Sequence, residues 1–328
     1  MFFRKEKLKM RFMKQLQEDL GVKAAKLINE KRGTQVYQGA LKGEEVIVKI
    51  HAEEKYFWRE LLSLRAMSEK NFIIPKLISY GTEFKRDGFG YLVWKKIQGE
   101  NLLSAYNKFE EKEKEQILYQ CGQFLGELNR ILSFDEIKVS QLWQYTSLEN
   151  ENIKFDSNGW KNYFINQIPK WITNINQLED PEIDFSKIEY LILENLKIIE
   201  TKKEELGLVH RDYGFRNILI RDKSIVGIID FEHAIIGDIL FDVAKLLFNS
   251  LRCDEVELSQ KFLRGWEERA NLRVKREKLF LFLAIQSLGA MQWVDSQKFE
   301  IRKENIEYRK KAKKTLIYSY HELKSFGR

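Results

Sequence analysis

The residues with the clearest chemical potential lie between Leu208 and Lys245. His210, Asp212 and Asn217 share one short stretch, and Asp230 follows 18 residues after Asp212, at the end of an apolar run. A carboxylate can take a proton from a hydroxyl, and carboxylate and amide oxygens suit Mg²⁺. Phosphoryl transfer needs such positioning and charge neutralisation more than it needs a covalent nucleophile. The spacing therefore predicts a phosphoryl-transfer site.

Each of these residues has an expected role. Asp212 is expected to be catalytic, by hydrogen-bonding the attacking hydroxyl and taking its proton late in the reaction. Asn217 and Asp230 are the expected ligands of Mg²⁺, which would bridge phosphate oxygens of ATP or GTP. His210 is expected to orient the loop rather than to act as a base. A polar turn between two buried strands is the alternative, but it leaves the combination of Asn217 and Asp230 unexplained.

A phosphate-binding lysine is expected upstream. Residues 45–50 alternate and are rich in β-branched side chains, which predicts a strand that carries Lys49 near its end. A helix is expected over residues 53–69, and it carries Glu60, 11 residues after Lys49, where an ion pair could hold the lysine. The alternative is a strand-end lysine in solvent, and the downstream motif favours the role in binding the α- and β-phosphates.

Two further segments are expected to contact the nucleotide. Residues 32–39, before a Lys42-Gly43 turn, predict a hairpin that covers phosphates, with Gly33 and Val36 among the nucleotide-binding residues. An ordinary hairpin is the alternative. The strand at residues 91–93 runs into a linker that ends at Gly99, where the backbone of Lys95 and Ile97 could bond the adenine edge.

The stretches HRDYGFRNILI and IIDFEHAIIGDILFDVAKL resemble those of bacterial small-molecule kinases of the aminoglycoside phosphotransferase and choline kinase superfamily. The resemblance implies an α+β, protein-kinase-like bilobal fold, with a small antiparallel-sheet lobe and a larger, mostly helical lobe. It implies that Asp212 is catalytic, that Asn217 and Asp230 bind magnesium, and that Lys49 with Glu60 anchors phosphates. It also implies that Asp242 supports the catalytic loop through hydrogen bonds.

Departures from neighbouring families narrow the acceptor. This family usually has glycine after the catalytic histidine, whereas this chain has Arg211, as protein kinases do. Unlike in protein kinases, Phe231 is followed by Glu232 and not by glycine. No Ala-Pro-Glu element follows, and Gly214 occupies the lysine position of serine/threonine kinases. These differences favour a small hydroxylated molecule over a protein substrate.

Length and composition agree with a two-lobed globular protein. The 328 residues are expected to divide into a nucleotide-binding lobe, 1–97, whose first helix covers residues 6–20, and a helical lobe, 98–328. Further helices are expected at residues 109–132, 159–175, 185–206 and 278–294. Two cysteines and the absence of a long apolar run predict a cytoplasmic protein with no membrane contact, as a monomer or homodimer.

The net charge of +7 raises nucleic acid as a rival partner. The basic run at residues 309–314 lies in a predicted helix, however, where a solvated face is the simpler interpretation, and no nucleic-acid-binding module accompanies it. We therefore expect no nucleic-acid partner.

The acceptor is expected to bind residues 134–184 and the C-terminal helices. Aromatic and acidic side chains in that insert suit a cationic amino sugar or a quaternary amine, although helix packing and solvated loops explain most of them as well. Glu232 is the acid expected nearest a bound amine. An aminoglycoside-like antibiotic is the first expectation. A macrolide, choline, homoserine or an amino sugar follow, with a protein kinase or a catalytically inactive nucleotide sensor as more distant alternatives.

Overall fold

The structure, a computed structural model, describes residues 17–31, 34–82, 89–133, 135–136, 141, 159–199, 202–251, 255–297 and 303–326. The chain forms two compact units. Unit 1 comprises the chain up to Gly99 together with Val226–His233, and unit 2 comprises Glu100–Ile225 and the chain from Ala234 onward. The functional boundary after Ile97 stays a prediction. Of the expected first helix, only residues 17–20 lie within the described ranges.

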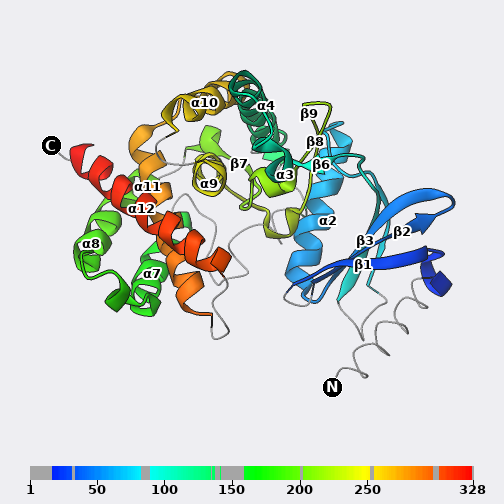
Figure 1. Ribbon diagram of the computed structural model, residues 1–328, viewed down its shortest axis with the longest axis horizontal. Coiled ribbons are helices and arrows are strands. Elements are labelled where there is room, and N and C mark those ends of the chain that lie inside the picture. The colour runs from blue at the N-terminus through cyan, green and yellow to red at the C-terminus, as the bar shows by residue number, and fades with distance from the viewer. Residues whose placement is uncertain are drawn as a thin grey trace. The chain divides into compact units, whose positions relative to one another are not determined.

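Unit 1 is built on an antiparallel sheet in the order β1-β2-β3-β5-β4 (Figure 1). Its strands are β1 (Lys23–Lys31), β2 (Thr34–Leu41), β3 (Glu44–His51), β4 (Leu77–Gly81) and β5 (Gly90–Lys95). Val46, Val48 and Ile50 alternate on the fully buried face of β3, which explains why this segment folds as a strand. Helix α2 (Glu54–Glu69) contacts β3 and β5.

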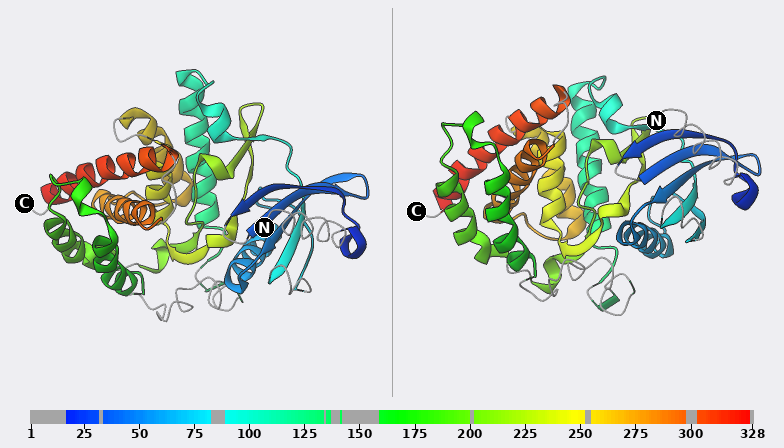
Figure 2. Two further views of the ribbon diagram at one scale, coloured as in Figure 1. Left: turned by 60° about the horizontal axis from the view of Figure 1, so that its bottom comes forward. Right: turned by 90° about the horizontal axis from the view of Figure 1, so that it is seen from below.

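Unit 2 is mostly helical (Figure 2). Its helices are α3 (Leu102–Tyr106), α4 (Glu111–Asn129), α7 (Gly159–Asn174), α8 (Phe185–Asn195), α9 (Leu240–Ser250), α10 (Val256–Ala270), α11 (Arg276–Asp295) and α12 (Lys303–Phe326). Short strands β6 (Glu100–Asn101) and β8 (Ile218–Arg221) pair with each other, as do β7 (Leu206–Val209) and β10 (Ile235–Asp238). Strand β9 (Ser224–Ile228) contains the passage of the chain from unit 2 into unit 1.

Helices α4 and α10 pack closely against each other in unit 2. A Cβ atom added at Gly122 would lie 2.1 Å from the backbone oxygen of Phe262, and one added at Gly126 would lie 2.8 Å from the nitrogen of Ala270. Because any side chain would collide with backbone, these two glycines let the helices approach. At the end of α4, Asn129 accepts a hydrogen bond from Trp266 of α10 and donates to the carbonyl of Leu208, just before the catalytic loop.

The helix expected over residues 185–206 is wrong in its second half. Helix α8 ends at Asn195, a short 3-10 turn covers Leu196–Ile199, and the chain is already strand β7 from Leu206. The side chain of Asn195 bonds the carbonyl of Leu191, a local bond typical of asparagine at a helix end. The helices expected at residues 53–69, 109–132, 159–175 and 278–294 are confirmed, with ends that differ by at most three residues.

The described part of the chain contains no helix that is both long and apolar enough to cross a bilayer. The small antiparallel sheet of unit 1 and the helical unit 2 together give the α+β, protein-kinase-like bilobal fold.

Candidate active site

Lys49 stands at the centre of a buried ion cluster in unit 1. Its ammonium lies 2.8 Å from Oε2 of Glu60 on α2 and 2.9 Å from Oε2 of Glu232, and it also pairs with Asp230. Only 6% of the Lys49 side chain is exposed. The ion pair expected between Lys49 and Glu60 is therefore present, and two further carboxylates share the same cation.

The cluster shifts the ionisation of its members. Burial alone would lower the pKa of Lys49, yet Asp230, Glu60 and Glu232 raise that pKa well above its ordinary value. Burial also opposes the charged form of Glu60, but Lys49 and His51 outweigh it, so the pKa of Glu60 is lowered. For Glu232, burial prevails and the pKa is raised. Lys49 therefore stays charged.

His51 is a member of this cluster that sequence reasoning missed. Its Nε2 lies 2.9 Å from Oε2 of Glu60, its Nδ1 lies 3.7 Å from Oε2 of Glu232, and the side chain is fully buried. Strand periodicity was the available signal, because residues 49 and 51 of one strand point to the same face. His51, Glu60 and Glu232 could geometrically surround a metal ion, but the ammonium of Lys49 already contacts the same carboxylate oxygens.

Asp230 is held beside Lys49 by the 3-10 turn that follows it. This turn, Phe231–His233, packs on α2, and the backbone nitrogen of Phe231 donates to Oε1 of Glu60 at 3.3 Å. Asp230 has a φ of 72°, a left-handed conformation that is uncommon outside glycine. Its side chain is 37% exposed, so its carboxylate is accessible as well as paired.

Glu232 does not lie free to meet a bound amine. Its carboxylate is engaged by Lys49, and 18% of the side chain is exposed. The amine-binding role expected of Glu232 stays a prediction. The observed ion pair with Lys49 indicates a structural role for this carboxylate.

The catalytic loop in unit 2 is fixed by Asp242 from α9. The carboxylate of Asp242 accepts from the backbone nitrogens of His210, at 2.6 Å, and of Arg211, at 2.8 Å, and it is also contacted by the amide of Asn129 at 3.4 Å. The loop-supporting hydrogen bonds expected of Asp242 are thus confirmed. Arg211 has a φ of 66°, which explains why glycine is common at this position in related kinases.

Asp212 is held by side-chain amides on both carboxylate oxygens. Nδ2 of Asn217 donates to Oδ2 at 3.1 Å and to the carbonyl of Asp212 at 2.9 Å, and Nδ2 of Asn249 donates to Oδ1 at 3.5 Å. The backbone nitrogen of Asp212 donates to Nδ1 of His210 at 3.3 Å, as expected for a histidine that orients the loop. The carboxylate is therefore held in one orientation.

The oxygen ligands expected for Mg²⁺ suit that ion. Asn217 uses its amide nitrogen for Asp212, and its amide oxygen has no hydrogen-bond donor among the described residues. The amide oxygen of Asn217 and the accessible carboxylate of Asp230 are each oxygen donors of the kind that Mg²⁺ prefers.

The nucleotide segments are placed in part. Val36 pairs with Lys49 across β2 and β3, so these two side chains share a face of the sheet. The backbone nitrogen of Lys95 donates to the carbonyl of Lys76 at 3.0 Å, and the expected contact of the Lys95 backbone with adenine stays a prediction. The backbone nitrogen of Ile97 has no backbone acceptor within the described ranges. Gly33 lies outside the described residues.

Most of the acids expected to meet a cationic acceptor are already paired inside unit 2. Asp180 binds Arg309 and Lys313, Glu182 binds Lys313, and Asp184 binds Lys187. The aromatics of α7 that can be described behave similarly: Trp160 and Phe164 are buried against Phe241 and Phe282. Phe134, Trp143, Tyr145 and Phe155 lie outside the described residues.

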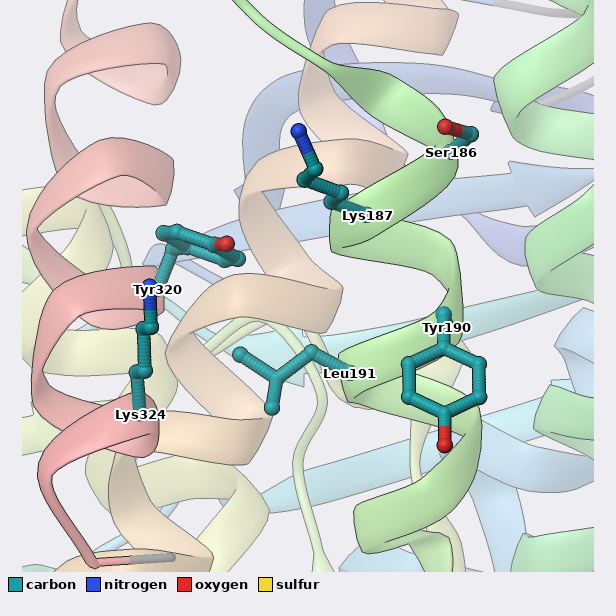
Figure 3. A pocket seen from close by; sticks show the side chains of 6 residues that line it. All are labelled: Ser186, Lys187, Tyr190, Leu191, Tyr320 and Lys324. Atoms are coloured by element: carbon teal, nitrogen blue, oxygen red, sulfur yellow. The ribbon is translucent and has the colours of Figure 1, made fainter. Parts of the chain in front are cut away.

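A surface pocket of about 360 Å³ lies between α8 and α12 (Figure 3). Its lining residues are Ser186, Lys187, Tyr190, Leu191, Tyr320 and Lys324, and Leu191 points from α8 towards α12. Tyr320 is roughly 18 Å along α12 from Tyr308, the residue of this helix that neighbours Asp212. A second cavity of about 460 Å³ is lined mainly by apolar residues of α9 to α12, and no residue of the catalytic loop lines it.

Comparisons with known proteins agree with this geometry. The model of the phosphotransferase enzyme family (APH) matches residues 25–277. No curated protein matches the chain. Solved structures match along nearly the whole chain, at identities that support the fold alone.

Three of these structures are representative. The ADP-bound aminoglycoside phosphotransferase APH(2'')-Ib is 19% identical, with a TM-score of 0.62, and the match covers 94% of this chain and 97% of that chain. A putative aminoglycoside phosphotransferase from Ralstonia eutropha is 13% identical, with a TM-score of 0.67 and coverage of 97% and 98%. A thermostable mutant of APH(4)-Ia, in complex with AMP-PNP and hygromycin B, is 18% identical, with a TM-score of 0.60 and coverage of 94% and 97%.

The family match spans well over half of the chain and includes Lys49, Asp212, Asn217 and Asp230. The protein therefore belongs to the phosphotransferase enzyme family and is a small-molecule kinase.

Proposed function

We propose that this enzyme transfers the γ-phosphoryl group of ATP to a hydroxyl of a small molecule, with Mg²⁺. The observation that carries the proposal is the environment of Asp212, whose two carboxylate oxygens are each held by a side-chain amide. Hydrogen bonds from the two amides fix the orientation of the carboxylate without protonating it. The carboxylate can therefore accept a proton from the substrate, as a catalytic base must.

The proposed step follows from the residues. The acceptor hydroxyl hydrogen-bonds Asp212, and its oxygen attacks the γ-phosphorus. The bond from that phosphorus to the bridging oxygen of ADP breaks, ADP leaves with the electron pair, and the hydroxyl proton passes to Asp212. Asn217 and Asp230 would hold Mg²⁺, which supplies neutralisation of phosphate charge.

Lys49 is the proposed ligand of the α- and β-phosphates, and Glu60 positions it. The 2.8 Å ion pair and the burial of both groups support this assignment. Val36, which shares the face of Lys49, and the backbone of Ile97 are proposed to contact the nucleotide, together with Gly33. ATP is favoured as donor because ADP and AMP-PNP are bound in structures of similar fold.

The acceptor class has two candidates. An aminoglycoside-like antibiotic is supported by the names of similar structures, which include complexes of gentamicin and hygromycin B with their enzymes. A metabolic alcohol is supported by the observed pairing of the acids at residues 180–184, which are no longer available to a polycation.

The test is acceptor-dependent release of ADP by the purified enzyme with Mg²⁺ and ATP. The acceptors are aminoglycosides, macrolides, choline, homoserine and amino sugars. We expect Asp212→Asn to bind ATP as the wild type does and to lose transfer, while Asp222→Asn, an exposed aspartate in the turn before β9, stays active. Full activity of Asp212→Asn would refute the assignment. Nucleotide binding without turnover on any acceptor would favour a sensing role.

A further inference from the structure

We propose that the acceptor carries an anionic group, a carboxylate or a phosphate, which is bound by Lys245 and Lys311 beside Asp212. This inference rests on the proposed function, because it concerns the second substrate of that reaction. It is drawn from unit 2 alone, where α9, α12 and the catalytic loop meet.

Lys311 of α12 is connected to the catalytic aspartate through Asn249. Its ammonium donates to the backbone oxygen of Asn249 at 3.1 Å, and the side chain of the same asparagine contacts Oδ1 of Asp212 at 3.5 Å. One residue thus bridges a cation and the proposed base. A substrate whose hydroxyl reaches Asp212 would meet this ammonium nearby.

Lys245 approaches the same place from α9. It precedes Asn249 by four residues, so the two side chains lie on one face of the helix. Its ammonium lies 6.0 Å from the ring of Phe248, which packs edge-on against Tyr308 of α12. No carboxylate lies within 4.0 Å of this ammonium in the described part of the chain.

The charges around Lys245 favour an anionic ligand. Burial lowers its pKa, Asp212 and Asp242 act to raise it, and Arg211 and Arg216 act to lower it further. A half-buried ammonium near two guanidinium groups is costly unless an anion joins it. The carboxylate of Asp242 is already committed to the backbone of the catalytic loop.

The surrounding charges disfavour a polycation. Arg211 and Arg216 flank Asp212 in sequence and, within the described ranges, neither has a carboxylate within 4.0 Å. Two acids that face α12, Asp180 and Asp295, are bound by Arg309. Among the described residues, a polycation would therefore face four positively charged groups beside Asp212.

The experiment compares one hexose skeleton in four charge states. D-Glucose, D-glucuronate, D-glucose 6-phosphate and D-glucosamine, with kanamycin A as a polycation, are titrated by calorimetry into the full-length enzyme saturated with Mg²⁺ and AMP-PNP. We expect glucuronate or glucose 6-phosphate to bind about tenfold or more tightly than glucose, and glucosamine to bind most weakly. The two anions separate a carboxylate site from a phosphate site.

The variants are Lys245→Met and Lys311→Met, which keep the length of the side chain and remove the charge. The matched control is Lys310→Met, the exposed neighbour of Lys311 on α12. We expect each test variant to lose roughly tenfold in affinity for the anionic sugar while its affinity for AMP-PNP and its melting temperature stay near wild type. The control should retain the anion preference.

Three results would overturn the inference. The first is equal binding of glucose and both anions, and the second is tighter binding of glucosamine or kanamycin A. The third is a loss of AMP-PNP affinity in the lysine variants with no change for the sugar, which would assign the lysines to the nucleotide. Failure of the wild-type enzyme to bind AMP-PNP would instead refute the proposed function. A separate titration of the enzyme with AMP-PNP measures this.

Discussion

The imidazole of His51 and the carboxylate of Glu60 meet at 2.9 Å, on the same oxygen that contacts the ammonium of Lys49 at 2.8 Å. The glutamate that positions the lysine is therefore itself positioned. Because His51 and Glu60 are both buried, water cannot replace either contact without a cavity.

Replacing His51 should therefore weaken nucleotide binding. We expect His51→Ala to raise the KM for ATP by roughly five- to thirtyfold, the equivalent of about 1–2 kcal/mol for a lost contact to a charged group, with kcat at saturating ATP close to wild type. His51→Gln keeps an N–H donor and should recover most of the loss. His321→Ala, on the exposed side of α12, is the control. An unchanged KM in His51→Ala would contradict the positioning role.

Lys49→Met should destabilise the fold as well as abolish nucleotide binding. Removing one partner of a buried ion pair costs about 3–5 kcal/mol, and here the carboxylates of Glu60 and Glu232 lose their shared cation. Urea unfolding at pH 7 measures the loss. Glu232→Gln in the same chain should restore part of it, because one uncompensated charge is removed.

Lys55→Met serves as the control for that series, since 43% of the Lys55 side chain is exposed and its partner is exposed as well. We expect less than about 1 kcal/mol of change there. Equal free energies of unfolding for Lys49→Met and Lys55→Met would show that the buried cluster does not stabilise the fold.

Glu60 predicts a loss of stability on the acid side. Burial opposes its charge, but Lys49 and His51 lower its pKa below the ordinary 4.5. A carboxyl with a lowered pKa contributes stability that is complete above its unfolded value and is lost as the pH falls through the folded value. The wild-type melting temperature should therefore drop below about pH 4.5, and the drop should be smaller in Glu60→Gln.

The control is Glu69→Gln, at the exposed end of the same helix. Its pH profile should follow the wild type. A Glu60→Gln profile parallel to the wild type would show that the ion pair contributes nothing to acid sensitivity.

Arg309 should be the most sensitive residue of the basic run. It binds Asp295 through two nitrogens, at 2.6 and 2.9 Å, and contacts Asp180 at 2.8 Å, so its removal leaves Asp295 without its cation and Asp180 with Lys313 alone. We expect Arg309→Met to lose about 3 kcal/mol in urea unfolding. The exposed pair of Arg264 with Glu268 gives the comparison, and Arg264→Met should lose less than about 1 kcal/mol.

The local patterns in the sequence located most of the fold. Alternation predicted β3, helical periodicity predicted α4, α7 and α11, and the motif spacing placed Asp212 beside Asn217. The end of α8 was not visible, because the apolar periodicity continues past Asn195 although the backbone changes to a 3-10 turn there.

What the sequence could not show were partners far apart in the chain. The pairing of Lys49 with Asp230 joins residues 181 positions apart, and nothing in either segment indicates that Glu232 would join them, although the strand period places His51 on the same face as Lys49. The same holds for the basic run at residues 309–314, where a solvated face was expected. Arg309 is instead largely buried, because acids from α11 and from the turn before α8 face it.

Unit 1 is built from two separate stretches of the chain, and this affects how it folds during synthesis on the ribosome. Gly99 emerges long before Val226, by roughly ten seconds at ordinary rates of synthesis. Throughout that interval Lys49 and Glu60 lack Asp230 and Glu232, and the buried Phe231 is missing from the packing on α2. Unit 1 therefore cannot complete its fold until residue 233 has been synthesised. A gene fragment that stops before that residue encodes an incomplete unit 1.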